Sequence, residues 1–141
     1  LIPDGTTVLI AVDNYPVRAR IETHVNTLQN ATVINGGNER DTGSCQLWIR
    51  RSGKNVTPPI SFLHPEILGG GDDRAAMTCT QVSALPGGEQ TIIANMASAT
   101  HMLVALSKAL YSDIRWTELS FDLMAGLAEP IDTRSRRGWA Q

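Results

Sequence analysis

Hydrophobic residues near the start of the chain change their spacing twice, and each change marks a new element. Residues 8–12 form a continuous apolar run, which is typical of a strand buried on both faces. From Val17 to Leu28, apolar residues recur at spacings of four, four and three, which predicts the apolar face of a helix. A second apolar run, residues 31–34, predicts a strand that leads into the Asn-Gly-Gly-Asn sequence at 35–38. Strand, helix and strand with short connections predict a βαβ unit of a parallel sheet.

The pattern changes again after this unit. Between residues 45 and 50, apolar side chains alternate with Gln46, Trp48 and Arg50, which predicts a half-exposed strand. Residues 57–90 contain most of the prolines, a run of three glycines and little periodicity. We therefore expect an irregular crossover loop there, of the kind that carries function.

The last third of the chain predicts one helix and one strand. Residues 90–110 are apolar almost all round, which indicates a helix buried on most faces, in a core or a subunit interface. Residues 116–123 alternate again and predict a final strand that ends near Gly126. From Glu129 onward we expect a mobile tail.

Composition and charge disfavour several classes of protein, namely those that bind nucleic acid, bind anionic membranes or span a bilayer. A length of 141 residues fits one domain, which we place at residues 1–130 with a C-terminal tail at 131–141. The net charge of −2 gives no electrostatic footprint for nucleic acid or an anionic membrane, so we expect neither as a partner. No apolar run approaches the roughly 20 residues that span a bilayer, and no signal peptide is visible. Two cysteines outside any CxxC pair favour a reducing, cytoplasmic setting.

Asp13 and Asn14 stand where the first strand ends and the first helix begins. Side chains at the carboxyl end of a parallel strand point into the crevice where doubly wound sheets bind nucleotides. A carboxylate there can hold Mg²⁺ that bridges phosphates. The structural alternative is a helix cap at either residue, with Pro16 in the first turn, which stabilises a helix by about 1 kcal/mol without any ligand. Composition alone leaves both interpretations open.

Several motifs together resemble the ThiF/MoeB/HesA family, the bacterial relatives of the ubiquitin-activating enzymes. Asp13, Asn14 and Arg18 form an Asp-Asn-x-x-x-Arg motif at the end of an apolar strand. Further segments follow in the order found in the family: the small residues at 33–37, the strand at 46–49, Thr-Cys-Thr-Gln-Val at 78–82, Leu-Pro-Gly at 85–87 and the closing segment at 118–126. The resemblance covers roughly residues 5–130. It implies an α/β, Rossmann-like adenylation fold of the ThiF type, of which this chain is the second half.

The resemblance also implies a reaction. In that family the enzyme binds ATP and Mg²⁺ and adenylates the C-terminal carboxylate of a ubiquitin-like or sulfur-carrier protein, sometimes working with a conjugating-enzyme-like protein. Asp13 would hold Mg²⁺ at the phosphates and neutralise the developing pyrophosphate. Asn14 and Arg18 fall on cofactor-binding positions, where Arg18 would fix Asp13 or a phosphate, or else be an exposed surface arginine. Cys79 matches a crossover-loop cysteine that forms a thioester, and the alternative is a buried, inert thiol.

The chain departs from the family in two ways. It lacks the two CxxC pairs that bind structural zinc in many members, so we expect no structural zinc. The family's glycine-rich phosphate loop and its other ATP contacts would precede the strand at residue 8. We therefore expect the sheet to be completed by another segment of the same polypeptide or by another chain, and the family suggests a homodimer.

The other candidate residues favour structural roles. Cys45 lies in an alternating strand, and His24, His64 and His101 are not spaced like metal ligands. Two other functions remain as alternatives to the enzyme. One is a catalytically inactive ThiF-like subunit for binding or dimerisation, and the other is an unrelated Rossmann-like oxidoreductase fragment with residues 35–37 near a cofactor. The absence of a GxGxxG sequence disfavours the oxidoreductase.

Overall fold

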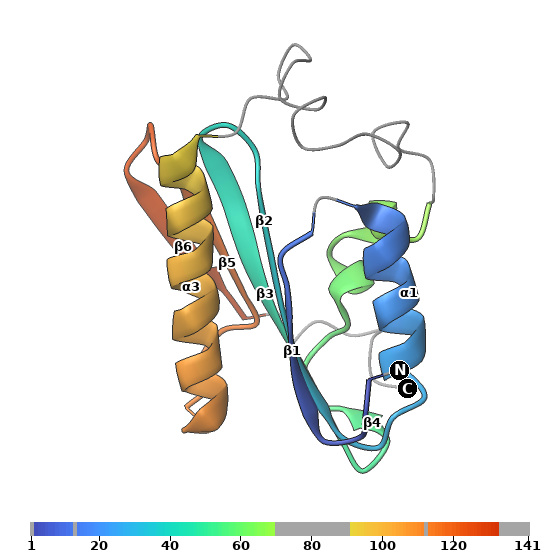
Figure 1. The fold of residues 1–141 in the computed structure, drawn as a ribbon. Helices are drawn as coiled ribbons and strands as arrows, with labels where there is room; N and C mark the ends of the chain where they lie inside the picture. Colours follow the sequence, from blue (N-terminus) through green and yellow to red (C-terminus); the bar gives the residue numbers. More distant parts are fainter. Residues whose placement is uncertain (1, 13, 70–90, 112, 133–141) are drawn as a thin grey trace.

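A computed structural model describes residues 2–12, 14–69, 91–111 and 113–132. In these residues the chain forms a mixed α/β fold, with a six-stranded sheet and an α-helix on each face (Figure 1). The elements in chain order are β1 (Thr6–Ile10), α1 (Tyr15–Val25), β2 (Ala31–Asn38), β3 (Thr42–Arg51), β4 (Lys54–Asn55), the 3-10 helices η1 (Ile60–Phe62) and η2 (Pro65–Ile67), α3 (Ile92–Leu110), β5 (Glu118–Asp122) and β6 (Leu127–Ile131). None of the described helices is long and apolar enough to cross a membrane.

The sheet has one parallel pair and is otherwise antiparallel. Its strand order is β1-β2-β3-β5-β6, and the short β4 pairs with β3 alone. β1 and β2 run parallel, from Thr6 opposite Ala31 to Ile10 opposite Asn35. The predicted βαβ unit is therefore confirmed. β2 continues through Gly36 and Gly37 and turns directly into β3, so the strand is longer than its apolar run.

β1 lies at the edge of the sheet, and the prediction that it is buried on both faces is wrong. Val8 and Ile10 pack into the core on the α1 side, where Ile10 is fully buried. Leu9 points to the other face and is 46% exposed. The reason is that α3 packs over β2 and β3 and leaves this face of β1 uncovered by any described element.

The prediction of a half-exposed β3 is also wrong, because both faces of this strand are covered. Cys45, Leu47 and Ile49 are buried under α3, as the alternation predicts. Gln46, Trp48 and Arg50 face the α1 side and are buried as well. Trp48 joins a core with residues of η1 and η2, and the two polar side chains are buried with hydrogen-bond partners. The polar half of the alternation thus marks a buried polar layer, not a solvent-facing surface.

α1 confirms the predicted helix, but it ends at Val25, before Leu28, and its buried stripe is more polar than the apolar spacing implied. The buried residues of the helix are Arg18, Glu22 and Val25, whereas Val17 is 38% exposed. Glu22 accepts hydrogen bonds from the main-chain N–H and the hydroxyl of Ser61, which fastens η1 to the helix. Charged residues on this face are therefore stabilised by specific partners in the neighbouring segments.

α3 confirms the predicted helix, but only one stripe of it is buried among the described residues. Ala94, Ser98, Met102 and Ala105 pack against the sheet. Figure 1 shows α3 along the outside of the sheet, with no described element beyond it. Its outer side carries exposed apolar residues, namely Ile92, Ile93, Met96, Leu103, Val104 and Leu110, which we call the outer face of α3. Among the described residues, α3 is thus buried on one stripe and not on most faces.

The C-terminal part contains one strand more than the pattern predicted. β5 is followed by a turn in which Gly126 adopts a left-handed φ of 66°, and β6 then pairs antiparallel with β5. The expected mobile tail from Glu129 is wrong as far as Ile131, because these residues belong to β6. The sequence pattern did not predict β6, because its residues are mostly exposed, and apolar and polar residues do not alternate along it.

Candidate functional site

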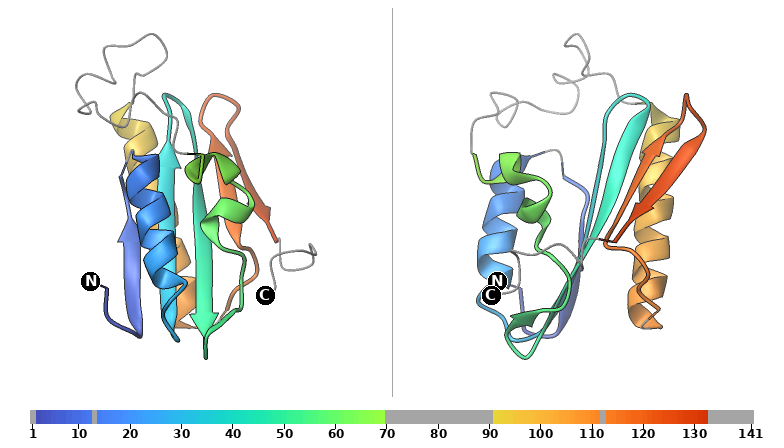
Figure 2. Two further views of the ribbon diagram at one scale, coloured as in Figure 1. Left: turned by 90° about the vertical axis from the view of Figure 1, so that its right-hand side faces the viewer. Right: turned by 180° about the vertical axis from the view of Figure 1, so that it is seen from behind.

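The ends of several elements point to the same end of the molecule. The carboxyl ends of β1 and β2 and the N-terminal ends of α1 and α3 lie in the upper half of Figure 1, with the two helices on opposite faces of the sheet, and the rear view in Figure 2 agrees. Parallel strands followed by helix N-termini form the type of edge at which α/β folds bind anionic ligands. This edge is the candidate site that the sequence pointed to.

Asn14 is the N-cap of α1. Its backbone is extended, with φ −135° and ψ 107°, and its side-chain oxygen accepts a hydrogen bond from the N–H of Val17 at 2.9 Å. Pro16 follows in the first turn, where a missing N–H leaves no hydrogen bond unmade. The cap predicted at residue 13 or 14 is therefore Asn14. The carboxylate of Asp13 is not needed for capping.

Arg18 joins the ends of the two parallel strands. Its Nε and Nη2 donate to the carbonyl oxygen of Val12 at 2.9 and 2.6 Å, and Nη2 also donates to the carbonyl oxygen of Gly36 at 3.0 Å. The side chain is only 8% exposed, so the interpretation as a surface arginine is wrong. Gly37 leaves room for the guanidinium, since a Cβ there would lie 3.3 Å from both Nη atoms. Arg18 thus fixes the main chain immediately before Asp13.

Asp13 and Cys79 lie outside the described residues, so their predicted roles are carried by the sequence alone. Within the described part of the chain, no cluster of three or more His, Cys, Asp and Glu side chains is placed to hold a metal ion. Asn14 and Arg18, the predicted cofactor-binding residues, bond to the main chain of Val17 and of Val12 and Gly36, respectively. Their hydrogen bonds shape the main chain on both sides of residue 13.

A buried polar network covers the middle of the sheet on the α1 side, and the sequence did not reveal it. The amide nitrogen of Asn35 donates to the amide oxygen of Gln46 at 2.5 Å. The amide nitrogen of Gln46 donates to Ser44 Oγ at 2.7 Å and to Glu118 Oε1 at 3.0 Å. His64 Nε2 lies 2.9 Å from the same Glu118 oxygen. Gln46 and Glu118 lie on neighbouring strands in register, which brings these distant residues together.

Burial and charge shift the acidity of several groups near this network. Hydrogen bonding to Glu118 raises the pKa of His64 above its ordinary value, against the opposing effect of burial. Burial, assisted by the charge of Glu118, raises the pKa of the Cys45 thiol to about 12, which supports its predicted structural role. Burial lowers the pKa of His101, whose ring lies 5.2 Å from that of Phe121.

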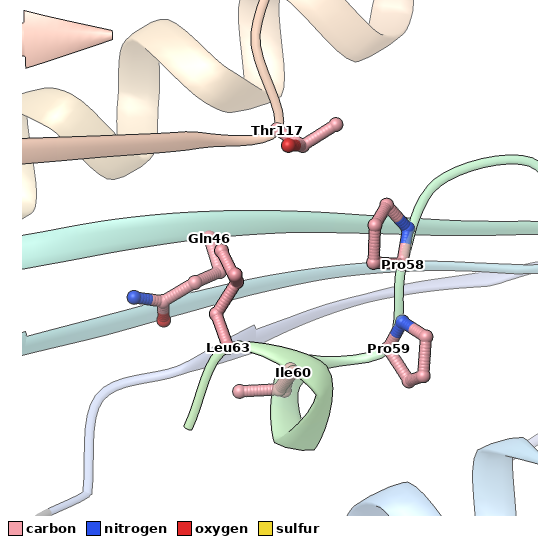
Figure 3. Close-up of a pocket in the computed structure, with 6 residues that line it drawn as sticks. All are labelled: Gln46, Pro58, Pro59, Ile60, Leu63 and Thr117. Carbon is pink, nitrogen blue, oxygen red and sulfur yellow. The ribbon is translucent and has the colours of Figure 1, made fainter. Parts of the chain in front are cut away.

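A small hollow lies beside this network among the described residues. It has a volume of about 10 Å³, enough for about one water molecule. Figure 3 shows its lining, which consists of Gln46, Pro58, Pro59, Ile60, Leu63 and Thr117. A nucleotide does not fit here.

No family model, curated protein or solved structure matches the chain. Functional inference therefore starts from the motif residues and from the geometry at the ends of β1 and β2.

Proposed function

We propose that the chain is part of an ATP-dependent enzyme of the ThiF/MoeB type, which activates the C-terminal carboxylate of a ubiquitin-like or sulfur-carrier protein by adenylation. In this proposal the mixed α/β fold is the second half of a Rossmann-like adenylation domain, and the protein works in the cytoplasm. The observation that carries the proposal is the clamp made by Arg18, which ties the carbonyls of Val12 and Gly36 together at the carboxyl ends of β1 and β2. The motif Asp-Asn-x-x-x-Arg then has a physical reason for its spacing.

The clamp explains what each motif residue contributes. Asn14 caps α1 and fixes where the helix begins, and Arg18, one turn later, holds the preceding strand end. In the sequence, Asp13 stands between these two fixed points. In the proposal Asp13 is the ligand of Mg²⁺, which, when bound, neutralises charge on the phosphates of ATP.

Cys79 would act after adenylation. Its thiolate attacks the carbonyl carbon of the acyl-adenylate, the bond from that carbon to the phosphate oxygen breaks, and AMP leaves with the electron pair. The product is a thioester between the partner protein and Cys79. A conjugating-enzyme-like protein would be a suitable acceptor for the acyl group.

The proposal also requires partners for the surfaces that this chain leaves open. The outer face of α3 is apolar, and the free edge of β1, with Leu9 half exposed, pairs with no described strand. We propose that a second copy, or another segment of the same polypeptide, covers them, and that the glycine-rich loop that binds the phosphates comes from another segment. Surfaces of this kind are unfavourable in water, which supports such an assembly.

The outer face of α3 also favours the second candidate function, a catalytically inactive ThiF-like subunit that binds or dimerises with an active one. Such a subunit would keep α3 as an interface and the clamp at Arg18 as a structural feature. It would not need Asp13 or Cys79.

ATP–pyrophosphate exchange separates the two functions. The complete natural polypeptide is incubated with Mg-ATP, radiolabelled pyrophosphate and a candidate ubiquitin-like protein, with the same protein lacking its C-terminal glycine as the matched control. The enzyme predicts exchange that depends on the intact C-terminus. Binding of the ubiquitin-like protein without any exchange would favour the inactive subunit and contradict the enzyme.

A further inference from the structure

His64 lies between two carboxylates that come from different parts of the chain. Its Nε2 is 2.9 Å from Glu118 Oε1 on β5, and its Nδ1 is 3.0 Å from Glu66 Oε1 in η2. The side chain of Glu118 is only 5% exposed, whereas that of Glu66 is 49% exposed. His64 therefore joins the segment of η1 and η2 to a buried acid of the sheet.

The count of hydrogen-bond donors and acceptors shows which protonation state of His64 makes both contacts. An ionised carboxylate only accepts hydrogen bonds, so each ring nitrogen must donate. The two amide hydrogens of Gln46 are used by Ser44 and Glu118, which leaves Nε2 of His64 as a donor to Glu118. Both contacts exist together only when the ring carries two protons and a positive charge. The neutral ring has a single N–H and must give up one of the carboxylates.

We propose that His64, Glu66 and Glu118 form a pH-dependent latch, which holds the η1–η2 segment to β5 more tightly while His64 is protonated and loosens when His64 loses its proton. The contact with Glu118 gives the latch most of its strength, because a charge-assisted hydrogen bond is stronger at a buried site than at the surface, where Glu66 lies. The proposal is independent of the adenylation reaction, since it concerns only the attachment of this segment.

The other groups around His64 do not reverse the direction of its pKa shift. Among the described residues, the charges that raise the pKa of His64 are the carboxylates of Glu118 and Glu66. From β3 comes the neutral amide of Gln46, and the thiol of Cys45, with its pKa of about 12, is uncharged near neutral pH. From α1, Glu22 is engaged with Ser61 and the Arg18 guanidinium donates to main-chain carbonyls.

The direction of the pH dependence follows from linkage. The pKa of His64 in the folded protein lies above its ordinary value of 6.5, which also applies to the unfolded chain. The stabilisation is therefore fully present below about pH 6.5 and is lost as the pH rises through the raised pKa of the folded state. The segment should be tightly held at mildly acidic pH and looser under alkaline conditions.

Amide hydrogen exchange of the complete protein measures the latch directly. The reporter is the N–H of Ile67, which donates to the carbonyl of His64, and the reference is the N–H of Gly5, which donates to the carbonyl of Asn30 far from the network. After correction for intrinsic exchange rates, protection of Ile67 should fall about threefold or more between about pH 6 and about pH 9, while that of Gly5 stays constant.

Three variants and a matched control complete the test. His64→Gln should give low protection of Ile67 with no pH dependence, and Glu118→Gln should lower the pKa of His64, seen by NMR titration, more than Glu66→Gln does. His24→Gln removes a histidine that bonds only to the main chain of Ile2 among the described residues, and it should behave like the wild type. Should Glu118→Gln fail to fold, the other variants still decide the outcome. A pH-independent wild type, or an unchanged profile in His64→Gln, would overturn the latch.

Discussion

Arg18 is a charged residue inside the βαβ unit, and its position has a simple cause. The carbonyls of Val12 and Gly36 lie at the ends of the parallel strands, and the guanidinium satisfies both at once. A planar group with several fixed donors suits this task better than the single ammonium group of lysine. The clamp therefore depends on the type of side chain as well as on its charge.

Replacing Arg18 should destabilise the fold. Arg18→Ala removes three charge-assisted hydrogen bonds and should lower the free energy of unfolding by about 3 kcal/mol, and Arg18→Lys by about 1–2 kcal/mol. Chemical denaturation with far-UV circular dichroism measures both. The control is Arg20→Ala on the exposed side of the same helix, expected within about 0.5 kcal/mol of wild type. Equal effects at both positions would show that the clamp contributes nothing.

Cys45 should be unreactive in the folded protein. Raising the pKa of its thiol from 9.0 to about 12 lowers the thiolate fraction on the order of a thousandfold, and the side chain is fully buried. A Cys79→Ser variant leaves Cys45 as the single thiol. We expect iodoacetamide to label it only in denaturant, as seen by intact mass. Rapid labelling of the native variant would contradict the buried position.

For single residues, the sequence predicted those roles that depend on neighbouring residues in the chain. The cap at Asn14 follows from its own neighbours, and the structural role of Cys45 follows from an alternating strand. The burial of Arg18 could not be predicted in this way, because its acceptors are supplied by two strands that only the fold brings together. The same holds for His64, whose partner Glu118 lies 54 residues away in the chain.

The sequence predicted the positions of single elements better than it predicted which of their faces are buried. The βαβ unit and α3 follow from apolar periodicity, which is a property of each segment. The covering of β3 on its polar face depends on η1 and η2, which have no periodic signal. The polar residues Gln46 and Arg50 then looked like solvent-facing positions, although their hydrogen-bond partners bury them.

Close packing at the β2–β3 hairpin gives a test at the level of the elements. A Cβ on Gly43 would lie 2.6 Å from the carbonyl oxygen of Gly37 and would also meet the ring of Phe121. Gly43→Ala should therefore lower the free energy of unfolding by about 2 kcal/mol, because neither neighbour can move easily. Gly69→Ala is the matched control, since its Cβ would make an ordinary contact at 3.4 Å. A difference of less than about 0.5 kcal/mol between the two variants would contradict the packing.

The whole molecule presents an apolar surface that water disfavours. Met96 and Leu103 on the outer face of α3 are 64% and 61% exposed. We expect this face to mediate self-association. The double variant Met96→Glu and Leu103→Glu should weaken association about tenfold or more, measured by analytical ultracentrifugation, without lowering the melting temperature.

The control for this variant is Leu68→Glu, which changes an equally exposed apolar residue beyond η2, away from α3. It should leave self-association unchanged. A wild-type protein that stays monomeric at high concentration would contradict self-association through α3. Another chain or segment would then have to cover the face.

The role of Asp13 is the central claim, and ATP–pyrophosphate exchange by Asp13→Asn tests it most directly. Since Asn14 already caps α1, this variant should keep the wild-type melting temperature to within about 2 °C. Its exchange activity should fall about a hundredfold or more, because the proposed ligand for Mg²⁺ is lost. Asn14→Ala serves as the opposite control, with stability lowered by about 1 kcal/mol through the lost cap. Full exchange activity in a folded Asp13→Asn protein would contradict the assignment of Asp13.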